Sequence, residues 1–168
     1  MSLQNIISEK TKNSAFIRRK FKFQKKNKIL WLVIIDDEKL LWELLEWINK
    51  LPANFIIITK NKFDDYDNII FVDLFDKIPL VWFDFVVCDN CVTNLLDYLK
   101  HWVVPIVPKD NYLDNVLKEF NPIKSEWNAF FYNEINKWEI FYALARYIEN
   151  YKFPYDNRNL IKNVIEIY

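Results

Sequence analysis

The chain has 168 residues, of which 52% are hydrophobic and 18% aromatic, and its 23 Lys or Arg and 23 Asp or Glu give a formal net charge of zero. This length suffices for one full domain and is too short for two, and no apolar run approaches the roughly 20 residues that span a bilayer. The N-terminus carries charge without the apolar stretch of a signal peptide, so we expect a cytoplasmic protein.

Charge is unevenly distributed along the chain. Residues 1–28 carry nine Lys or Arg against one acid, Glu9, which is a net charge of +8 and leaves −8 for the remainder. We expect 1–28 to form a basic N-terminal arm or helix that precedes a domain at 29–168. Residues 10–28 could contact nucleic acid or an anionic membrane surface. The simpler interpretation is a solvated lead-in, or docking on the acidic body.

Apolar runs alternate with amphipathic segments along the first two thirds of the chain. The run ILWLVII at 29–35 predicts a strand that is covered on both faces. Residues 36–50 predict an amphipathic helix with acids at its start, where the helix dipole favours them. The next predicted elements are strands at 55–59 and 69–72, a short irregular or helical piece around 78–81, a strand at 83–88, a helix at 91–101 and a strand at 103–107.

The last third of the chain continues this alternation. We expect a short helix at 112–120, a strand at 129–132, an amphipathic helix at 134–151 and a terminal helix after Pro154. Short buried strands that alternate with helices indicate βαβ units. The predicted fold is therefore a single α/β domain with three layers, a Rossmann-like doubly wound parallel sheet.

Cys88 and Cys91 form a CxxC motif between a predicted strand and a predicted helix, where the helix dipole would lower a thiol pKa. We expect buried, inert thiols instead, because the motif lies mid-chain; a CxxC redox protein is a minor alternative. Zinc needs four ligands, which the two cysteines and the lone His101 do not supply. His101 is expected to cap its helix. The sequence thus predicts neither a metal nor a cofactor.

A second minor alternative is a receiver-like domain. The stretch IIDDEK follows the first predicted strand and Asp89 ends a later one, as in the acidic pocket of response-regulator receiver domains, where carboxylates hold a metal. The lysine expected at the end of a late strand is missing, which weighs against this interpretation.

Asp89 and Asp97 are separated by seven residues, and a helix, a turn and a PIV strand follow them in DNCVTNLLDYLKHWVVPIV, residues 89–107. This frame resembles the C-terminal, nucleotide-sugar-binding domain of retaining GT-B glycosyltransferases of the glycogen and starch synthase type. That family has E-x7-E, a helix, a turn glycine and a PIV-like strand. Here both acids are Asp, and Trp102 stands on the glycine.

Three further motifs extend the resemblance over roughly residues 29–166. KDNYLDNV at 109–116 resembles the family's GGLADTV loop, and EWNAFFY at 126–132 resembles its G-x-GF-x-F. Lys39 lies near the family's phosphate-contacting lysine, whereas the neighbouring arginine has no equivalent.

The resemblance implies a donor-binding half-domain. Asp89 would be the catalytic-site residue that faces the donor sugar, Asp97 would bind the ribose hydroxyls and Lys39 the phosphate. The backbone N–H groups of Cys91, Val92 and Thr93 would face the diphosphate, as helix N-termini do. The simpler interpretation is that Asp89 caps its helix and Asp97 is a solvated surface residue.

The implied ligand is a nucleotide sugar of the UDP or ADP type. GT-B enzymes work in a cleft between two domains, so catalysis would need a partner chain with the acceptor domain, unless the domain is degenerate. The competing function is a non-enzymatic Rossmann-like interaction module that binds protein, membrane or nucleic acid.

The chain has no glycine and seven tryptophans. Replacing Trp82, Trp102 and Trp127 by glycine improves the family resemblance at each position. We hypothesise that the seven tryptophan codons are UGA, which the source organism would decode as glycine. The alternative is an AT-rich genome in which glycine codons were depleted. Tryptophan in a turn that needs a positive φ costs about 1–2 kcal/mol.

Overall fold

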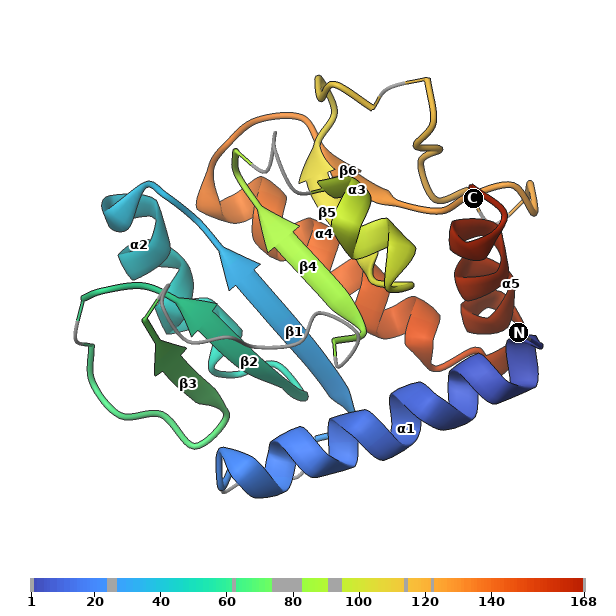
Figure 1. The fold of residues 1–168 in the computed structure, drawn as a ribbon. Helices are drawn as coiled ribbons and strands as arrows, with labels where there is room; N and C mark the ends of the chain where they lie inside the picture. Colours follow the sequence, from blue (N-terminus) through green and yellow to red (C-terminus); the bar gives the residue numbers. More distant parts are fainter. Residues whose placement is uncertain are drawn as a thin grey trace.

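The structure is a computed structural model that describes residues 2–23, 27–61, 63–73, 83–90, 95–113, 115–121 and 123–167. Within these residues the chain forms one α/β domain (Figure 1). Among them, no helix combines the length and the apolar character needed to cross a bilayer.

A six-stranded sheet forms the middle layer, and every neighbouring pair of strands is parallel. Its order is β3-β2-β1-β4-β5-β6, so the chain winds outward from β1 in one direction and from β4 in the other. This confirms the predicted Rossmann-like doubly wound sheet. The strands are β1 (Ile29–Ile34), β2 (Ala53–Ile58), β3 (Ile69–Val72), β4 (Phe85–Cys88), β5 (Val104–Pro108) and β6 (Phe130–Tyr132).

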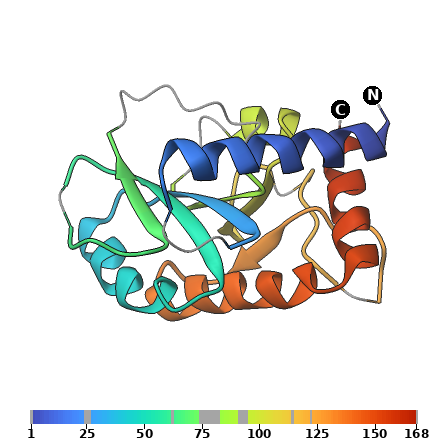
Figure 2. The same ribbon diagram turned by 90° about the horizontal axis from the view of Figure 1, so that it is seen from below.

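The helices make the outer layers. Helices α2 and α4 cover one face of the sheet, and α3 covers the other (Figures 1 and 2). We call the edge where the strands end the carboxyl edge, and the edge where they begin the amino edge; α1 crosses the amino edge. The helices are α1 (Leu3–Lys20), α2 (Glu38–Ile48), α3 (Leu95–Lys100), α4 (Lys137–Tyr151) and α5 (Pro154–Ile165).

Side-chain oxygens fix the starts of three helices, as N-caps do. Ser2 accepts a hydrogen bond from Asn5 N (3.3 Å), Asp37 accepts one from Leu40 N (3.0 Å), and Asn136 accepts from Trp138 N and Glu139 N (both 3.0 Å). At α5, Pro154 takes the first helical position, where its missing N–H has no cost. Sequence-local caps therefore set these boundaries.

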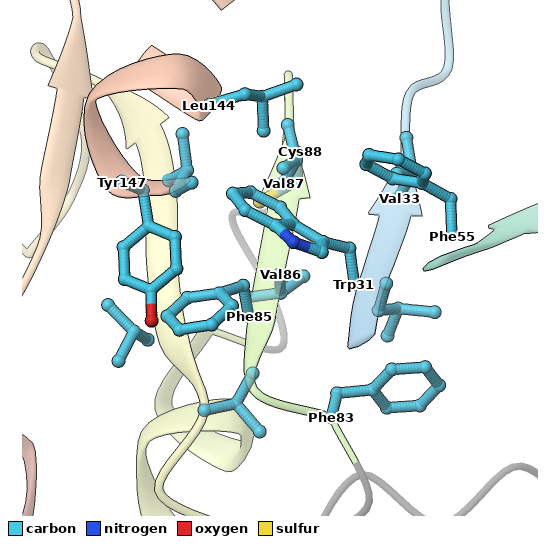
Figure 3. Close-up of a cluster of buried hydrophobic side chains, with 14 of the residues drawn as sticks. Trp31, Val33, Phe55, Phe83, Phe85, Val86, Val87, Cys88, Leu144 and Tyr147 are labelled. Carbon is cyan, nitrogen blue, oxygen red and sulfur yellow. The ribbon is translucent and has the colours of Figure 1, made fainter. Parts of the chain in front are cut away.

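An aromatic cluster lies between the sheet and α4 (Figure 3). Trp31 in β1 is fully buried, with its ring centroid 5.0 Å from that of Phe85 and 5.4 Å from that of Tyr147. Phe85 and Tyr147 are closer still, at 3.7 Å between centroids. Large aromatic side chains bury much apolar area each, so this cluster is a major part of the core.

The expected helix at 112–120 is wrong. Its apolar spacing is helical, and Leu113 and Leu117 are indeed buried, but the described residues of 112–120 form turns and an extended piece. Asn128 explains the difference, because its side-chain oxygen accepts a hydrogen bond from Lys118 N (2.7 Å) and Glu119 pairs with Ala129 in a parallel bridge. These tertiary bonds replace the helical ones. The expected piece at 78–81 lies outside the described residues.

Candidate functional site

The candidate site lies at the carboxyl edge, between β1 and β4. These strands are neighbours, with Ile34 beside Cys88 in register, and the strand order reverses direction between them. In open parallel sheets, ligands bind in the crevice outside the strand ends at such a switch point. The residues that follow β1 and β4 are therefore the first candidates.

Asp89 follows β4 directly and joins the two loops at this point. Its carboxylate accepts hydrogen bonds from Asp36 N at 3.1 Å on Oδ1 and at 2.9 Å on Oδ2, and from Asp37 N at 3.2 Å. Only 8% of Asp89 is exposed. Asp89 thus accepts hydrogen bonds from backbone N–H groups, as a cap does. These groups belong to the loop that leads into α2, and not to the helix that follows Asp89 in the sequence.

A cavity of about 250 Å³ opens beside Asp89. Its wall is formed by the ends of β4 and β5, the start of α3, the loop that follows β5 and the segment between β6 and α4. Tyr112 and Ile135 in this wall are 46% and 55% exposed. The lining residues are Asp89, Asn90, Leu95, Val107, Pro108, Asp110, Asn111, Tyr112 and Ile135. Ligand pockets usually measure roughly 300–1,000 Å³, so this cavity has the size of part of a site.

Asn111 shapes the loop in the wall of the cavity. Its side-chain Nδ2 donates to the carbonyl of Pro108 (2.9 Å), and its Oδ1 accepts from Leu113 N (2.9 Å). The first bond ties the loop to the end of β5, and the second fixes the loop itself. Polar side chains that bond nearby backbone groups in this way are a common means of fixing loops.

Tyr132 in β6 fixes the end of β4 from the opposite side. Its hydroxyl donates to the carbonyl of Cys88 at 2.6 Å, and the side chain is almost fully buried. Burial, and then the charge of Asp89, raise the pKa of the Tyr132 phenol, which keeps it protonated as a donor. The sequence predicts a strand here but not this contact, because no local pattern pairs Tyr132 with residue 88.

Asp97 lies on α3 and does not line the cavity. Its side chain is 56% exposed and forms an ion pair with Lys100 at 3.4 Å. The carbonyl of Asp97 accepts a hydrogen bond from Nδ1 of His101 (2.7 Å), so His101 caps the end of α3 as expected. The structure therefore does not bring Asp89 and Asp97 into one pocket.

Lys39 is exposed in the first turn of α2 and also lies outside the lining of the cavity. Its neighbours Asp36, Asp37 and Glu38 are acids. The start of α2 is accordingly a poor anion site by itself, because these acids repel an anion and the carboxylate of Asp89 already lies against the backbone N–H groups of Asp36 and Asp37 just before the helix. The predicted site residues Cys91, Val92 and Thr93 lie outside the described residues.

Cys88 is buried, as expected, but it is disulfide-bonded rather than a free thiol. In the described parts of the chain, no group of three or more His, Cys, Asp or Glu side chains could hold a metal ion.

Trp102 follows α3 in a left-handed conformation, with φ of 58°. The hydrogen bonds from Trp102 N to Leu99 O (2.9 Å) and from Val103 N to Tyr98 O (3.0 Å) form a Schellman motif. Its left-handed position is usually glycine, because other residues carry a Cβ there. The predicted glycine-type turn is thus present at Trp102.

Neither a protein-family profile nor a curated protein sequence matches this chain. Among solved structures, its fold is similar to the catalytic domain of starch synthase IV from Arabidopsis thaliana bound to ADP and acarbose. The TM-score is 0.75 at 14% sequence identity, and the match covers 95% of this chain but 39% of that one. Starch synthase IV is a GT-B glycosyltransferase, so the chain has the fold of a GT-B domain.

Proposed function

We propose that this domain binds the nucleotide sugar of a GT-B glycosyltransferase reaction at the carboxyl edge, beside Asp89. The observation that carries the proposal is the position of Asp89, which joins the loops after β1 and β4 at the switch point and lines the cavity there. The fold, shared with a glycosyltransferase that binds ADP, supports an ADP-type donor before a UDP-type one.

Asp89 retains room for a ligand. A carboxylate offers about four lone-pair positions, and the backbone N–H groups of Asp36 and Asp37 use one on Oδ1 and two on Oδ2. The remaining position on Oδ1 can accept a hydrogen bond from a sugar hydroxyl. In this proposal Asp89 orients the donor sugar, and its three backbone contacts keep its carboxylate in place.

The nucleotide then extends from the cavity across the start of α3. Asp97, on the exposed face of α3, accepts from the ribose hydroxyls, and Lys39 at the start of α2 neutralises phosphate charge. The diphosphate lies against the backbone N–H groups of residues 91–93. Asp36, Asp37 and Glu38 precede Lys39 and would repel phosphates at the start of α2, which favours the position at residues 91–93 instead.

The acceptor comes from elsewhere. The cavity is small, and Tyr112 and Ile135 are exposed in its wall. This chain also covers only 39% of the starch synthase chain. A second domain or a partner chain that closes over Tyr112 and Ile135 would complete the cleft, and we expect sugar transfer only with that partner.

Calorimetric titration with ADP-glucose and UDP-glucose tests the proposal. Asp97→Ala should weaken binding about 10- to 100-fold, because it removes hydrogen bonds to a charged acceptor. Glu149→Ala is a matched control, since Glu149 is an exposed helix residue with a lysine partner three residues on, Lys152. Absence of binding heat with both sugars, or equal affinity of the two variants, would contradict the proposal.

A further inference from the structure

A second charged hollow lies at the amino edge, at the end of α1. Its volume is about 540 Å³, and four of the seven described residues that line it are cationic: Arg18, Arg19, Lys22 and Lys28, beside Ala15, Phe23 and Asn27. None of the described residues that line this hollow is an acid. We propose that this basic hollow binds the phosphate backbone of a single-stranded nucleic acid.

Arg18 gives the hollow a fixed wall. Its Nη2 donates a hydrogen bond to the carbonyl of Lys28, and its Nη1 donates to Ser14 Oγ at 3.2 Å. The first bond joins the end of α1 to the residue that precedes β1, although ten positions separate them in sequence. This bond therefore holds the cationic end of α1 against the start of β1.

The described surroundings offset the positive charge of the hollow only in part: the carboxylate of Asp84 interacts electrostatically with Lys10 and, more weakly, with Arg18. Residues 10–35 contain no acid, and across the described part of the chain no salt bridge involves Arg19, Lys22 or Lys28. The nearby carboxylate of Asp84 accepts a hydrogen bond from Leu30 N (2.9 Å). The helix dipole adds only about half a negative charge at the C-terminal end of α1. A bound polyanion would supply the missing counter-charge.

A nucleic acid strand fits this hollow better than a membrane surface. A helix that binds in the bilayer interface needs a free apolar face, but the apolar residues Ile6 and Ile17 of α1 are buried in the domain. The outer face of α1 instead presents Phe16, which is 55% exposed, at helical spacing from Lys12 and Arg19. Cationic side chains interleaved with an exposed aromatic ring are typical of single-strand binding, since bases stack on the ring.

The basic hollow is separate from the proposed donor site. Lys28 immediately precedes β1, whereas Asp36 and Asp37 follow it at the other end of the strand. The six residues of β1, at about 3.3 Å each, place the two sites about 20 Å apart. Binding at one site should therefore leave the other intact.

Fluorescence anisotropy with a labelled single-stranded 20-nucleotide DNA, over a series of NaCl concentrations, tests the inference. The test variant combines Arg19→Gln, Lys22→Asn and Lys28→Gln; Asn is chosen at position 22 because it tolerates the positive φ of 52° found there. Arg18 is left in place because it holds the backbone. The control variant, Lys118→Gln, Lys124→Gln and Lys152→Gln, removes the same charge from exposed positions elsewhere.

The wild type and the control variant should bind the oligonucleotide with strong salt dependence, and the test variant at least 10-fold more weakly. Its slope of log K against log salt should be smaller by about 2, since each lost phosphate contact changes the slope by about 0.7. Equal losses in both variants would overturn the inference. So would wild-type binding to vesicles of anionic lipid without binding to the oligonucleotide. ADP-glucose affinity, measured in parallel, should not change in the test variant.

Discussion

Both carboxylate oxygens of Asp89 accept a hydrogen bond from the backbone N–H of Asp36, a residue 53 positions earlier in the chain. Strand pairing brings the ends of β1 and β4 together, but it does not fix the loops that follow them. The carboxylate of Asp89 does so and also places a negative charge at the start of α2, where the helix dipole favours it. Stability and the geometry of the candidate site therefore depend on one side chain.

Asp89→Asn should lower the free energy of unfolding by about 2 kcal/mol, because hydrogen bonds to a charged acceptor become weaker and the new amide N–H₂ faces a backbone donor. Urea denaturation at pH 7 measures this change. Asp110→Asn is the control, since Asp110 lines the same cavity but is exposed; its effect should stay within about 0.5 kcal/mol. Equal effects of the two substitutions would show that the bonds from Asp36 and Asp37 contribute little.

Trp102→Gly should raise the free energy of unfolding by about 1 kcal/mol, because glycine removes the cost of a Cβ at a φ of 58°. Thermal and urea denaturation would both report this gain. Trp102→Ala separates backbone from side-chain effects, since alanine removes the indole and keeps the Cβ. If the alanine and glycine variants are equally stable, the positive φ is not the cause.

The recoding hypothesis predicts that glycine suits every tryptophan position, so we compare Trp31 with Trp102. Trp31→Gly should destabilise the domain by about 3–5 kcal/mol or more, as removal of a large buried side chain does, because Trp31 packs on Phe55, Phe85 and Tyr147. The two positions therefore differ: a glycine suits position 102, and an indole suits position 31. The gene's codons decide the matter, since UGG at Trp102 and Trp127 would exclude recoding.

The predicted sheet agrees well with the structure because its strands are marked locally. Continuous apolar runs such as 29–35 and 85–88 have no amphipathic alternation, as expected of strands that are buried on both faces. Parallel strands end at one edge, so Asp89 and the loop after β1 are expected at the same edge of the sheet, but their adjacency depends on the strand order found in the structure. The positive φ at Trp102 was expected from the helix–turn–strand pattern around it.

Long-range polar contacts were not predictable from the sequence. The bond from Tyr132 to the carbonyl of Cys88 and the bond from Lys118 N to Asn128 join residues 44 and 10 positions apart. The apolar spacing at 112–120 predicts a helix, but the bond from Lys118 N to Asn128 holds this segment in another conformation. The exposure of Asp97 depends on where α3 packs, which the E-x7-E-like spacing alone does not define.

Lys10 makes the stability of the domain depend on pH in the alkaline range. This side chain of α1 is 5% exposed, and its Nζ donates to the carbonyl of Phe83 at 2.6 Å. Burial lowers the pKa of Lys10 from its ordinary value of 10.5 to about 8, although the nearby Asp84 acts in the opposite direction. Between these two values the unfolded chain still holds the Lys10 proton that the folded chain has released. The unfolded state then binds more protons, so stability rises with pH.

Lys10→Met should remove this dependence, because methionine does not titrate and has a similar length. Between pH 8 and 10.5 the wild type should gain about 3 kcal/mol relative to the variant, at 1.36 kcal/mol per unit of pKa shift. Urea denaturation at several pH values across this range measures the difference between the two curves. Lys12→Met, an exposed substitution on the same helix, should run parallel to the wild type. Parallel curves for Lys10→Met as well would mean that Lys10 keeps its ordinary pKa in the folded domain.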